Sequence, residues 1–320
     1  MPPIRIRSPP DGLAKKDFFG VSHGIVKKHI MLYHTIGFVD YLGFTEESTM
    51  ATQDSNVYPA PPEYGGFKRK IQQLTGIDLD AYKYQIHRRV HMMMQRWDVK
   101  SYDDYYKEIA NNPERLREFL DYLTINVTEF FRNTNRWWEL RDKIIPNMYK
   151  ELGHQRIKFW SAGCSTGEEP YSLAILAMET KVSTPQPVLA ADIDQGVLAK
   201  AQAGVYQKRQ ITNAPKEWVP KYFTEVDANT VTVKKEVKDK VKFRHMNLIK
   251  DRFESGFDLI LCRNVVIYFE PETKSALYKK FLEALRPGGY LMTGATEQIF
   301  DHKTIGFESV GPFLYRRPQK

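Results

Sequence analysis

The chain has 320 residues, of which 42% are hydrophobic and 27% are charged, a composition ordinary for a soluble globular protein of one or two domains. No apolar run approaches the roughly 20 residues that span a bilayer, and the amino terminus has Pro and Arg where a signal peptide needs an apolar core. We therefore expect no membrane insertion, no secretion and a cytoplasmic location. The net charge of +8 allows nucleic acid, anionic lipid or an acidic protein as partner, and it chooses none of them.

The two cysteines, Cys164 and Cys262, are too few for a disulfide framework or a metal cluster. Free cysteines are commonly buried, so we expect both to be small core residues in a reducing compartment. We expect no metal site.

Residues 1–65 form an amino-terminal extension to which the sequence assigns no role, because Pro and Gly interrupt any helix or strand period at both of its ends. Residues 66–133 are expected to form an all-helical domain and a linker. Ser101 with Asp104 predicts a capped helix start, and Pro113 suits a first helical turn. Apolar residues at helical spacing occupy 67–74, 81–97, 101–110 and 113–124.

The second of these helical segments is strongly basic. Its arginines Arg88, Arg89 and Arg96 fit either a solvated face or a docking surface for an acidic partner. The run Met92–Met94 is expected to pack in the core of the helical domain.

From about residue 156 strand-like runs alternate with helical runs, which predicts a mainly parallel sheet covered by helices on both faces. Residues 134–320 are therefore expected to form an α/β domain. An insertion at about 205–243 alternates like a short antiparallel β-subdomain, which fits either partner binding or plain elaboration of the fold. The predicted strands are 157–162, 187–193, 241–247, 257–264 and 289–294.

In such sheets ligands bind beyond the carboxyl ends of the strands. The loop Ser161–Gly167 follows the first strand, and its small residues, Gly163 among them, let the backbone approach a ligand closely. Asp192 follows the second strand and is the usual type of acceptor for ribose hydroxyls. Asn247 follows the third strand, where an amide could read an adenine edge. The fourth strand is followed by Arg263, Asn264 and Tyr268.

The loop after the first strand lacks the features that bind phosphate. It has neither a closely spaced glycine triplet nor a Gly-Lys-Ser/Thr ending, and it leads into Glu168 and Glu169. Two carboxylates would repel a phosphate but would suit a cofactor that has ribose, adenine and a cationic end, such as S-adenosylmethionine. A favourable interaction with the helix N-terminus also explains both glutamates and is compatible with a binding role.

Five segments stand out along the chain: NVTEFFRN (126–133), FWSAGCSTGEEPYSLA (159–174), ADIDQGVLAKA (191–201), ILCRNVVIYF (260–269) and LRPGGYLMTGATE (285–297). They resemble the signature blocks of the CheR-type chemoreceptor methyltransferases, in the family's order over roughly residues 67–318. The resemblance implies a class I S-adenosylmethionine-dependent methyltransferase, a Rossmann-like and mainly parallel α/β fold with an N-terminal all-α domain and a small inserted antiparallel β-subdomain. The implied reaction esterifies glutamate side chains on the cytoplasmic helical domain of methyl-accepting chemoreceptors, with S-adenosylhomocysteine as product.

The resemblance also implies roles for individual residues. Arg132 and Tyr268 would lie nearest the transferring methyl group, one of Glu168 and Glu169 would contact the methionine part of the cofactor, and Asp192 would bind its ribose. The basic helix gains an acidic partner, because receptor methylation regions are rich in glutamate. The remaining implied contacts are Asn126, Thr128 and Arg132 from the linker, Gly163 in the loop, Asn247 and Leu248 at the adenine, Arg263 and Asn264 lining the site, and Arg88, Arg89 and Arg96 docking the receptor.

Two other functions stay open at this point. The same fold could methylate a different acceptor, and a catalytically silent module could bind S-adenosylmethionine or its product as a signal. Nucleic acid is not expected as substrate, because the segment after the fourth strand lacks the Asn-Pro-Pro-aromatic run of base methyltransferases. We expect a monomer.

Overall fold

The computed structural model describes residues 60–83, 85–124, 128–151 and 156–319, all of which belong to one compact unit. Most of the extension 1–65 lies outside the described residues. Within the described ranges, no helix combines the length and the apolar character that crossing a bilayer requires.

The first folded region is the predicted all-helical domain, whose core consists of apolar side chains from all of its α-helices. Ser101 caps α4 as predicted, since its Oγ accepts the Asp104 N–H at 3.0 Å, and Met93 and Met94 are buried in the core. The first helix begins at Pro62, earlier than the predicted start at residue 67, because proline fits a first helical turn. The elements are α2 (Pro62–Thr75), η1 (Leu79–Ala81), α3 (Gln85–Arg96), α4 (Tyr102–Asn111) and α5 (Pro113–Thr124).

A helical stretch that the sequence did not predict precedes the sheet. It runs through α6 (Thr134–Glu139), a π-helical turn η2 (Leu140–Ile144) and α7 (Ile145–Glu151). Trp137 and Leu140 from this stretch are buried in the same core as one face of the sheet. Burial of these helices therefore holds the linker that precedes Thr134 against the sheet domain.

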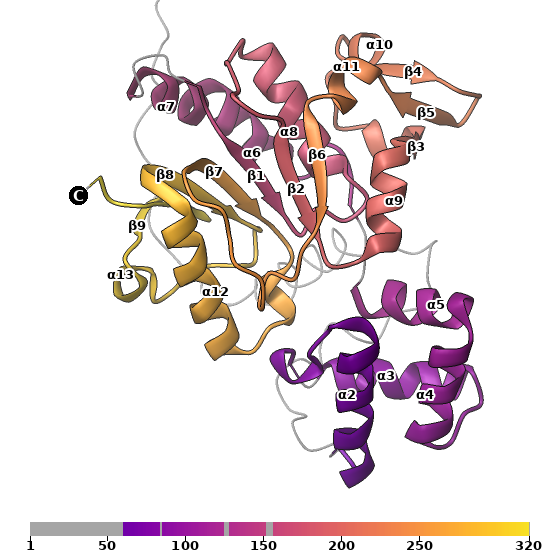
Figure 1. Cartoon of the computed structure of the whole chain (residues 1–320). Helices are drawn as coiled ribbons and strands as arrows, with labels where there is room; N and C mark the ends of the chain where they lie inside the picture. Colours follow the sequence, from indigo (N-terminus) through magenta and orange to yellow (C-terminus); the bar gives the residue numbers. More distant parts are fainter. Residues whose placement is uncertain (1–59, 84, 125–127, 152–155, 320) are drawn as a thin grey trace, which may run out of the picture. The chain divides into compact units, whose positions relative to one another are not determined.

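The second region is built on a seven-stranded sheet with the order β6-β2-β1-β7-β8-β10-β9 (Figure 1). The strands from β6 to β8 are parallel, as predicted, whereas β10 and β9 join the sheet antiparallel. The β9–β10 hairpin was not predicted, because its strands are too short to display a clear alternation. The strands are β1 (Phe159–Ala162), β2 (Val188–Asp192), β6 (Val241–His245), β7 (Phe257–Cys262), β8 (Leu285–Thr293), β9 (Glu308–Gly311) and β10 (Leu314–Arg316).

Helices cover both faces of this sheet. Phe159 belongs to the core beneath α8 (Glu168–Glu179) and α9 (Gln195–Ala203), and the next residue, Trp160, belongs to the core beneath α12 (Pro271–Ala284) and α13 (His302–Ile305). The chain proceeds from β1 outward to β2 and β6 and then returns to β7 on the other side of β1. The carboxyl ends of β1 and β7 therefore flank a topological switch point, where ligands bind in open α/β sheets.

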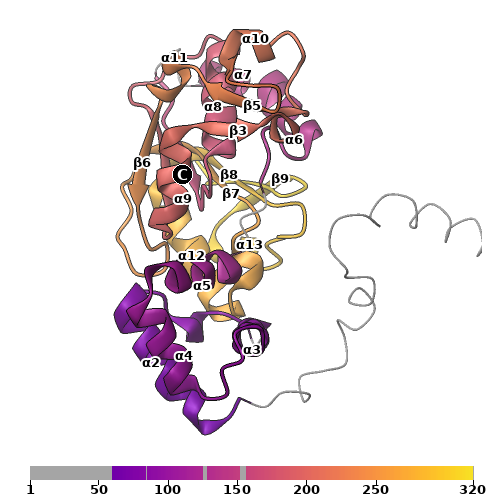
Figure 2. The same cartoon turned by 90° about the vertical axis from the view of Figure 1, so that its right-hand side faces the viewer.

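The insertion between α9 and β6 forms the predicted antiparallel subdomain, a three-stranded sheet with the order β3-β5-β4. Its strands lie beside two short helices, α10 and α11 (Figure 1, Figure 2). An Asp-Ala-Asn turn joins β4 to β5, and the Asp227 carboxylate accepts the Asn229 N–H at 2.8 Å. The elements are β3 (Val205–Gln207), η3 (Lys208–Ile211), α10 (Val219–Tyr222), β4 (Phe223–Glu225), β5 (Thr230–Val233) and α11 (Lys235–Lys238).

Candidate active site

A pocket opens at the topological switch point and collects most of the residues that the sequence singled out. Side chains from both folded regions line it, including Tyr82 and Leu123 of the helical domain. Asn126 lies outside the described residues, and Glu168 does not line the pocket. The predicted residues that do line it are Thr128, Arg132, Gly163, Glu169, Asp192, Asn247, Leu248, Arg263, Asn264 and Tyr268.

The loop after β1 is held by the end of β2. The N–H groups of Gly163 and Cys164 donate to the Ala191 carbonyl at 2.8 and 2.9 Å, and the Ser165 N–H donates to the Asp192 carboxylate at 2.8 Å. Gly163 has a φ of +79°, and a Cβ at this position would come within 2.3 Å of Val265 Cγ2. Only glycine allows the loop to approach the segment after β7 this closely.

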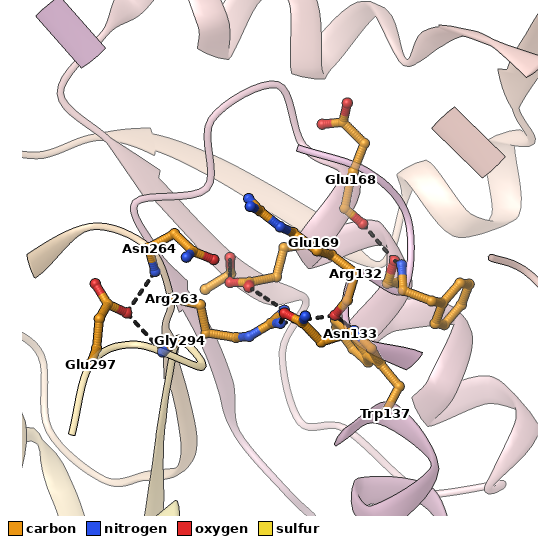
Figure 3. A network of polar contacts seen from close by, with 12 residues as sticks. Arg132, Asn133, Trp137, Glu168, Glu169, Arg263, Asn264, Gly294 and Glu297 are labelled. Carbon is orange, nitrogen blue, oxygen red and sulfur yellow. Dashed lines mark hydrogen bonds and ion pairs between the residues drawn. The ribbon is translucent and has the colours of Figure 1, made fainter. Parts of the chain in front are cut away.

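The two adjacent glutamates at the start of α8 have different surroundings. Glu168 is fully buried and accepts hydrogen bonds from Thr166 Oγ1 at 2.7 Å and from Gln210 Nε2 of the inserted subdomain at 2.6 Å. Glu169 instead accepts from Ser161 Oγ at 2.8 Å and lines the pocket. Figure 3 shows the Glu168 side chain directed away from the network that contains Glu169. Of the two predicted ligand contacts, the structure brings only Glu169 to the pocket.

Glu168 and its neighbours also connect the subdomain to the linker. Gln210, which donates to Glu168, accepts the Phe130 N–H through its own carbonyl at 2.9 Å. Ser172 Oγ donates to the Glu168 carbonyl at 2.7 Å and accepts the Phe131 N–H at 3.0 Å. These bonds hold the segment that carries Arg132 against α8.

Arg263 joins several parts of the site. Its guanidinium donates to the Arg132 carbonyl and to Asn133 Oδ1, both at 2.8 Å, and to the Glu169 carboxylate at 3.3 Å (Figure 3). The Arg263 side chain is only 4% exposed. Burial raises the pKa of Glu169, while the positive charge of Arg263 acts in the opposite direction. The Arg263 guanidinium is thus held by Glu169 and by the linker residues Arg132 and Asn133.

Glu297 organises the loop after β7, and the sequence analysis assigned it no role. Its buried carboxylate accepts three backbone N–H groups, those of Asn264 at 2.6 Å, Gly294 at 2.7 Å and Ile267 at 3.1 Å. Asn264 has a φ of +60°, in the left-handed region that these bonds stabilise. The sequence feature that could have pointed to Glu297 is its position just beyond the carboxyl end of the predicted strand 289–294.

Asp192 and Asn247 lie at the ends of β2 and β6. Burial raises the pKa of Asp192, although hydrogen bonds from backbone N–H groups oppose the shift. The Asn247 amide is engaged in its own loop, where Oδ1 accepts the Ile249 N–H at 3.0 Å and Nδ2 donates to the Gly76 carbonyl at 3.3 Å. The amide thus shapes its own loop, and because Asn247 also lines the pocket, its expected use at an adenine edge stays a prediction.

Lys280 of α12 holds the same loop from its other side. Its ammonium donates to the carbonyls of Leu248, Ile249 and Asp251 at 2.7, 2.9 and 2.8 Å. Leu248 and Ile249 line the pocket, so Lys280 fixes the backbone on which these two apolar side chains stand. This role could not be predicted from the sequence, because Lys280 lies about 30 residues beyond the carbonyls that it binds, on the far side of β7.

The three arginines predicted to dock a partner do not share one environment. Arg89 is half-buried, donates to the carbonyls of Tyr122 and Leu123 at 3.0 and 3.1 Å, and lies 6.0 Å from the ring centroid of Tyr268. Arg88 is exposed, and Arg96 is exposed and 3.7 Å from Glu118. Arg89 thus packs at the active site, because its guanidinium satisfies carbonyls at the end of α5. The docking role of all three arginines stays a prediction.

Comparisons with known proteins agree with this architecture. The model of the CheR methyltransferase SAM-binding domain matches residues 126–312, and that of the CheR methyltransferase all-alpha domain matches residues 62–124. A chemotaxis protein methyltransferase of Listeria innocua is 37% identical over 255 residues, which cover 79% of this chain and 96% of that protein.

Chemotaxis protein methyltransferases of other bacteria are also similar to this chain. A chemotaxis protein methyltransferase of Borreliella burgdorferi is 33% identical, with 76% of this chain and 89% of that protein covered. Chemotaxis protein methyltransferase 1 of Pseudomonas aeruginosa is 32% identical, with 73% of this chain and 89% of that protein covered. The two family-model matches, residues 62–124 and 126–312, together include every residue that lines the pocket.

Proposed function

We propose that this chain, which belongs to the CheR methyltransferase family, transfers a methyl group from S-adenosylmethionine to glutamate side chains of chemoreceptors. It is an S-adenosylmethionine-dependent methyltransferase with a class I fold. The observation that carries the proposal is a pocket at the switch point that combines the carboxylates of Glu169 and Asp192 with the half-buried Tyr268 and with Arg132.

The pocket fits a cofactor that has a cationic end and no phosphate. Its lining includes Glu169 and Asp192, whose charges would repel a phosphate and attract an ammonium or sulfonium group. We assign Glu169 to the methionine part and Asp192 to the ribose hydroxyls. The loop at Leu248 would receive the adenine, with Thr128 and Arg132 reaching the cofactor from the linker.

Methyl transfer to a carboxylate requires little acid–base catalysis by the protein. When bound, S-adenosylmethionine supplies an electrophilic methyl group. A glutamate side chain, with a usual pKa of about 4.3, is already ionised at pH 7, so no general base is needed. The residues of the pocket therefore have to position the carboxylate in line with the methyl group and exclude water.

Tyr268 and Arg132 are suited to holding the acceptor. Burial raises the pKa of Tyr268, so its hydroxyl stays protonated at neutral pH and can donate a hydrogen bond to a carboxylate. Arg132 lines the pocket beside Tyr268, and we assign it as the cation that orients the acceptor. One cation and one neutral donor orient the carboxylate without the full ion pairing that would weaken it as a nucleophile.

The acceptor glutamates are assigned to the cytoplasmic helical region of the receptor, which places the reaction in the cytoplasm. The test is incubation of the full chain with labelled S-adenosylmethionine and receptor-containing membranes. We expect methyl label on the receptor that mild alkali releases, because esters hydrolyse and N-methyl groups do not. Alkali-resistant label would reject glutamate esterification, and label on a small molecule but on no receptor would reject the acceptor.

A further inference from the structure

The segment between β8 and α13, called here the β8–α13 loop, carries the most exposed large hydrophobic side chain of the described residues, Phe300. Phe300 is 85% exposed, whereas its neighbour Ile299 is only 1% exposed. Exposed and buried positions alternate along this loop, because Thr296 and Gln298 also face solvent while Glu297 is buried. The outward face of the loop from Thr296 to Phe300 is therefore uncharged and ends in a phenyl ring.

Hydrogen bonds hold the backbone on both sides of Phe300. The Ile299 N–H donates to Tyr315 Oη at 2.7 Å. On the other side, the Asp301 carbonyl accepts the Ile305 N–H at 3.0 Å. A ring on a backbone that is already fixed loses little conformational freedom when a partner covers it, because only its two side-chain torsions remain to be ordered. Phe300 is thus preorganised for contact with another molecule.

The β8–α13 loop is bonded to the segment that carries Tyr268. The Glu297 carboxylate accepts the N–H groups of Asn264 and Ile267, and Ile267 directly precedes Tyr268 (Figure 3). Phe300 is three residues beyond Glu297, and a chain advances at most about 3.6 Å per residue, so the two Cα atoms lie within about 11 Å of each other. Phe300 therefore belongs to the surface around the active site, although it does not line the pocket.

A protein that places a glutamate side chain in the pocket also covers the surface around the pocket. A standard interface buries about 800 Å² on each partner, which corresponds to a round area with a radius of about 16 Å. A single helix is already about 10–12 Å wide, so a helical acceptor whose glutamate lies at Tyr268 extends over the β8–α13 loop. The uncharged outward face of this loop does not repel an acceptor that is rich in glutamate, and its phenyl ring offers apolar contact area.

We propose that Phe300 is an apolar anchor for the acceptor protein and inserts between helices of that protein, next to the glutamate to be methylated. The anchor rests on the proposed glutamate methylation and specifies its partner as a helical protein with an apolar groove beside the methylated position. Phe300 acts on docking alone, because it does not line the pocket and contacts neither the cofactor nor the reacting carboxylate.

The experiment measures co-sedimentation of the full chain, saturated with S-adenosylhomocysteine, with receptor-containing membranes, and methylation kinetics on the same membranes. Phe300→Ser should weaken binding and raise the KM for the receptor about tenfold, the loss expected for one buried phenyl ring. Its kcat and its S-adenosylhomocysteine affinity, measured by calorimetry, should be unchanged. Phe300→Leu should retain most of the binding. Val310→Ser is the matched control, because Val310 is an exposed hydrophobic residue on β9.

A Phe300→Ser variant with the binding and the receptor KM of the wild type would overturn the anchor. An equal loss in Val310→Ser would also overturn it, since a general decrease in surface hydrophobicity would explain both. A wild-type dimer that Phe300→Ser dissociates would assign the ring to a second copy of this chain instead. Binding that depends on Phe300 in a wild type that labels no receptor would support the anchor and reject the proposed function, whereas receptor labelling that is independent of Phe300 would do the reverse.

Discussion

Glu297→Gln tests whether a single buried carboxylate positions the loop after β7. The two oxygens of Glu297 receive N–H groups from Asn264 and Gly294 on one side and from Ile267 on the other. A glutamine has nearly the same shape but only one acceptor oxygen. If that oxygen accepts the N–H groups of Asn264 and Gly294, the amide NH₂ lies opposite the Ile267 N–H. Two hydrogen-bond donors then face each other.

The size of the effect follows from the bond that is lost. A hydrogen bond to a charged group contributes about 1.5–3 kcal/mol, and the buried N–H of Ile267 would also lose its partner. We expect the free energy of unfolding to fall by about 2–3 kcal/mol, a substantial part of the 5–15 kcal/mol that is usual for a domain. Tyr268 follows Ile267 directly, and a displacement of about 1 Å at a positioned group can lower kcat/KM about 100-fold.

The assay combines urea unfolding with methyl-transfer kinetics and calorimetry of S-adenosylhomocysteine binding. Asp258→Asn is the matched control, because Asp258 is also a buried carboxylate that accepts a backbone N–H, that of Lys158 at 2.6 Å, but it lies at the amino end of β7. The control should lose stability and keep its kcat and its cofactor affinity. A Glu297→Gln variant with wild-type stability and kinetics would refute the positioning argument, and one with reduced stability alone would leave Glu297 a purely structural role.

Four further substitutions test the assignments in and beside the pocket. Asp192→Ala should weaken S-adenosylhomocysteine binding about tenfold or more, and calorimetry that returns the wild-type affinity would show that Asp192 does not bind the ribose. Tyr268→Phe should lower kcat about tenfold while cofactor affinity changes little, whereas equal losses in both would argue against a role at the acceptor. Burial raises the pKa of Glu169, so its charge and the cofactor affinity should decrease on acidification from about pH 7 toward pH 5. Glu169→Gln should weaken cofactor binding at pH 7 and remove the part of this pH dependence that Glu169 causes. Glu168→Gln is the control and should leave the cofactor affinity near wild type.

The parts of this molecule that the sequence predicted are those governed by short-range patterns. Strand-like apolar runs that alternate with helical runs predicted the parallel sheet, and positions at strand ends predicted the pocket residues after β1, β2 and β7. The β9–β10 hairpin and the helices α6 and α7 lacked such a pattern. Their stability comes from burial of residues such as Trp137 against a sheet that the local sequence does not reveal.

The remaining differences concern the direction in which a side chain points. Adjacent helical residues point about 100° apart, so one of Glu168 and Glu169 had to face the pocket and the other the subdomain. The sequence could not choose, because the rotation of α8 is set by packing. Arg89 likewise belongs to a basic run, but its direction depends on carbonyls more than 30 residues away at the end of α5. Tyr82 enters the pocket through a bridge to Phe269, a contact between distant segments.

The bonds of Gln210 have a consequence for how the inserted subdomain is studied. Its side chain satisfies Glu168, and its carbonyl satisfies the Phe130 N–H. Excision of the insertion would remove one hydrogen-bond donor from the buried Glu168 carboxylate and the acceptor of the Phe130 N–H, on the helix and the linker that carry Glu169 and Arg132. The insertion is therefore not a detachable module. A deletion variant would lose activity whatever the subdomain binds, and only substitutions on its outer strands can separate partner binding from support of the catalytic domain.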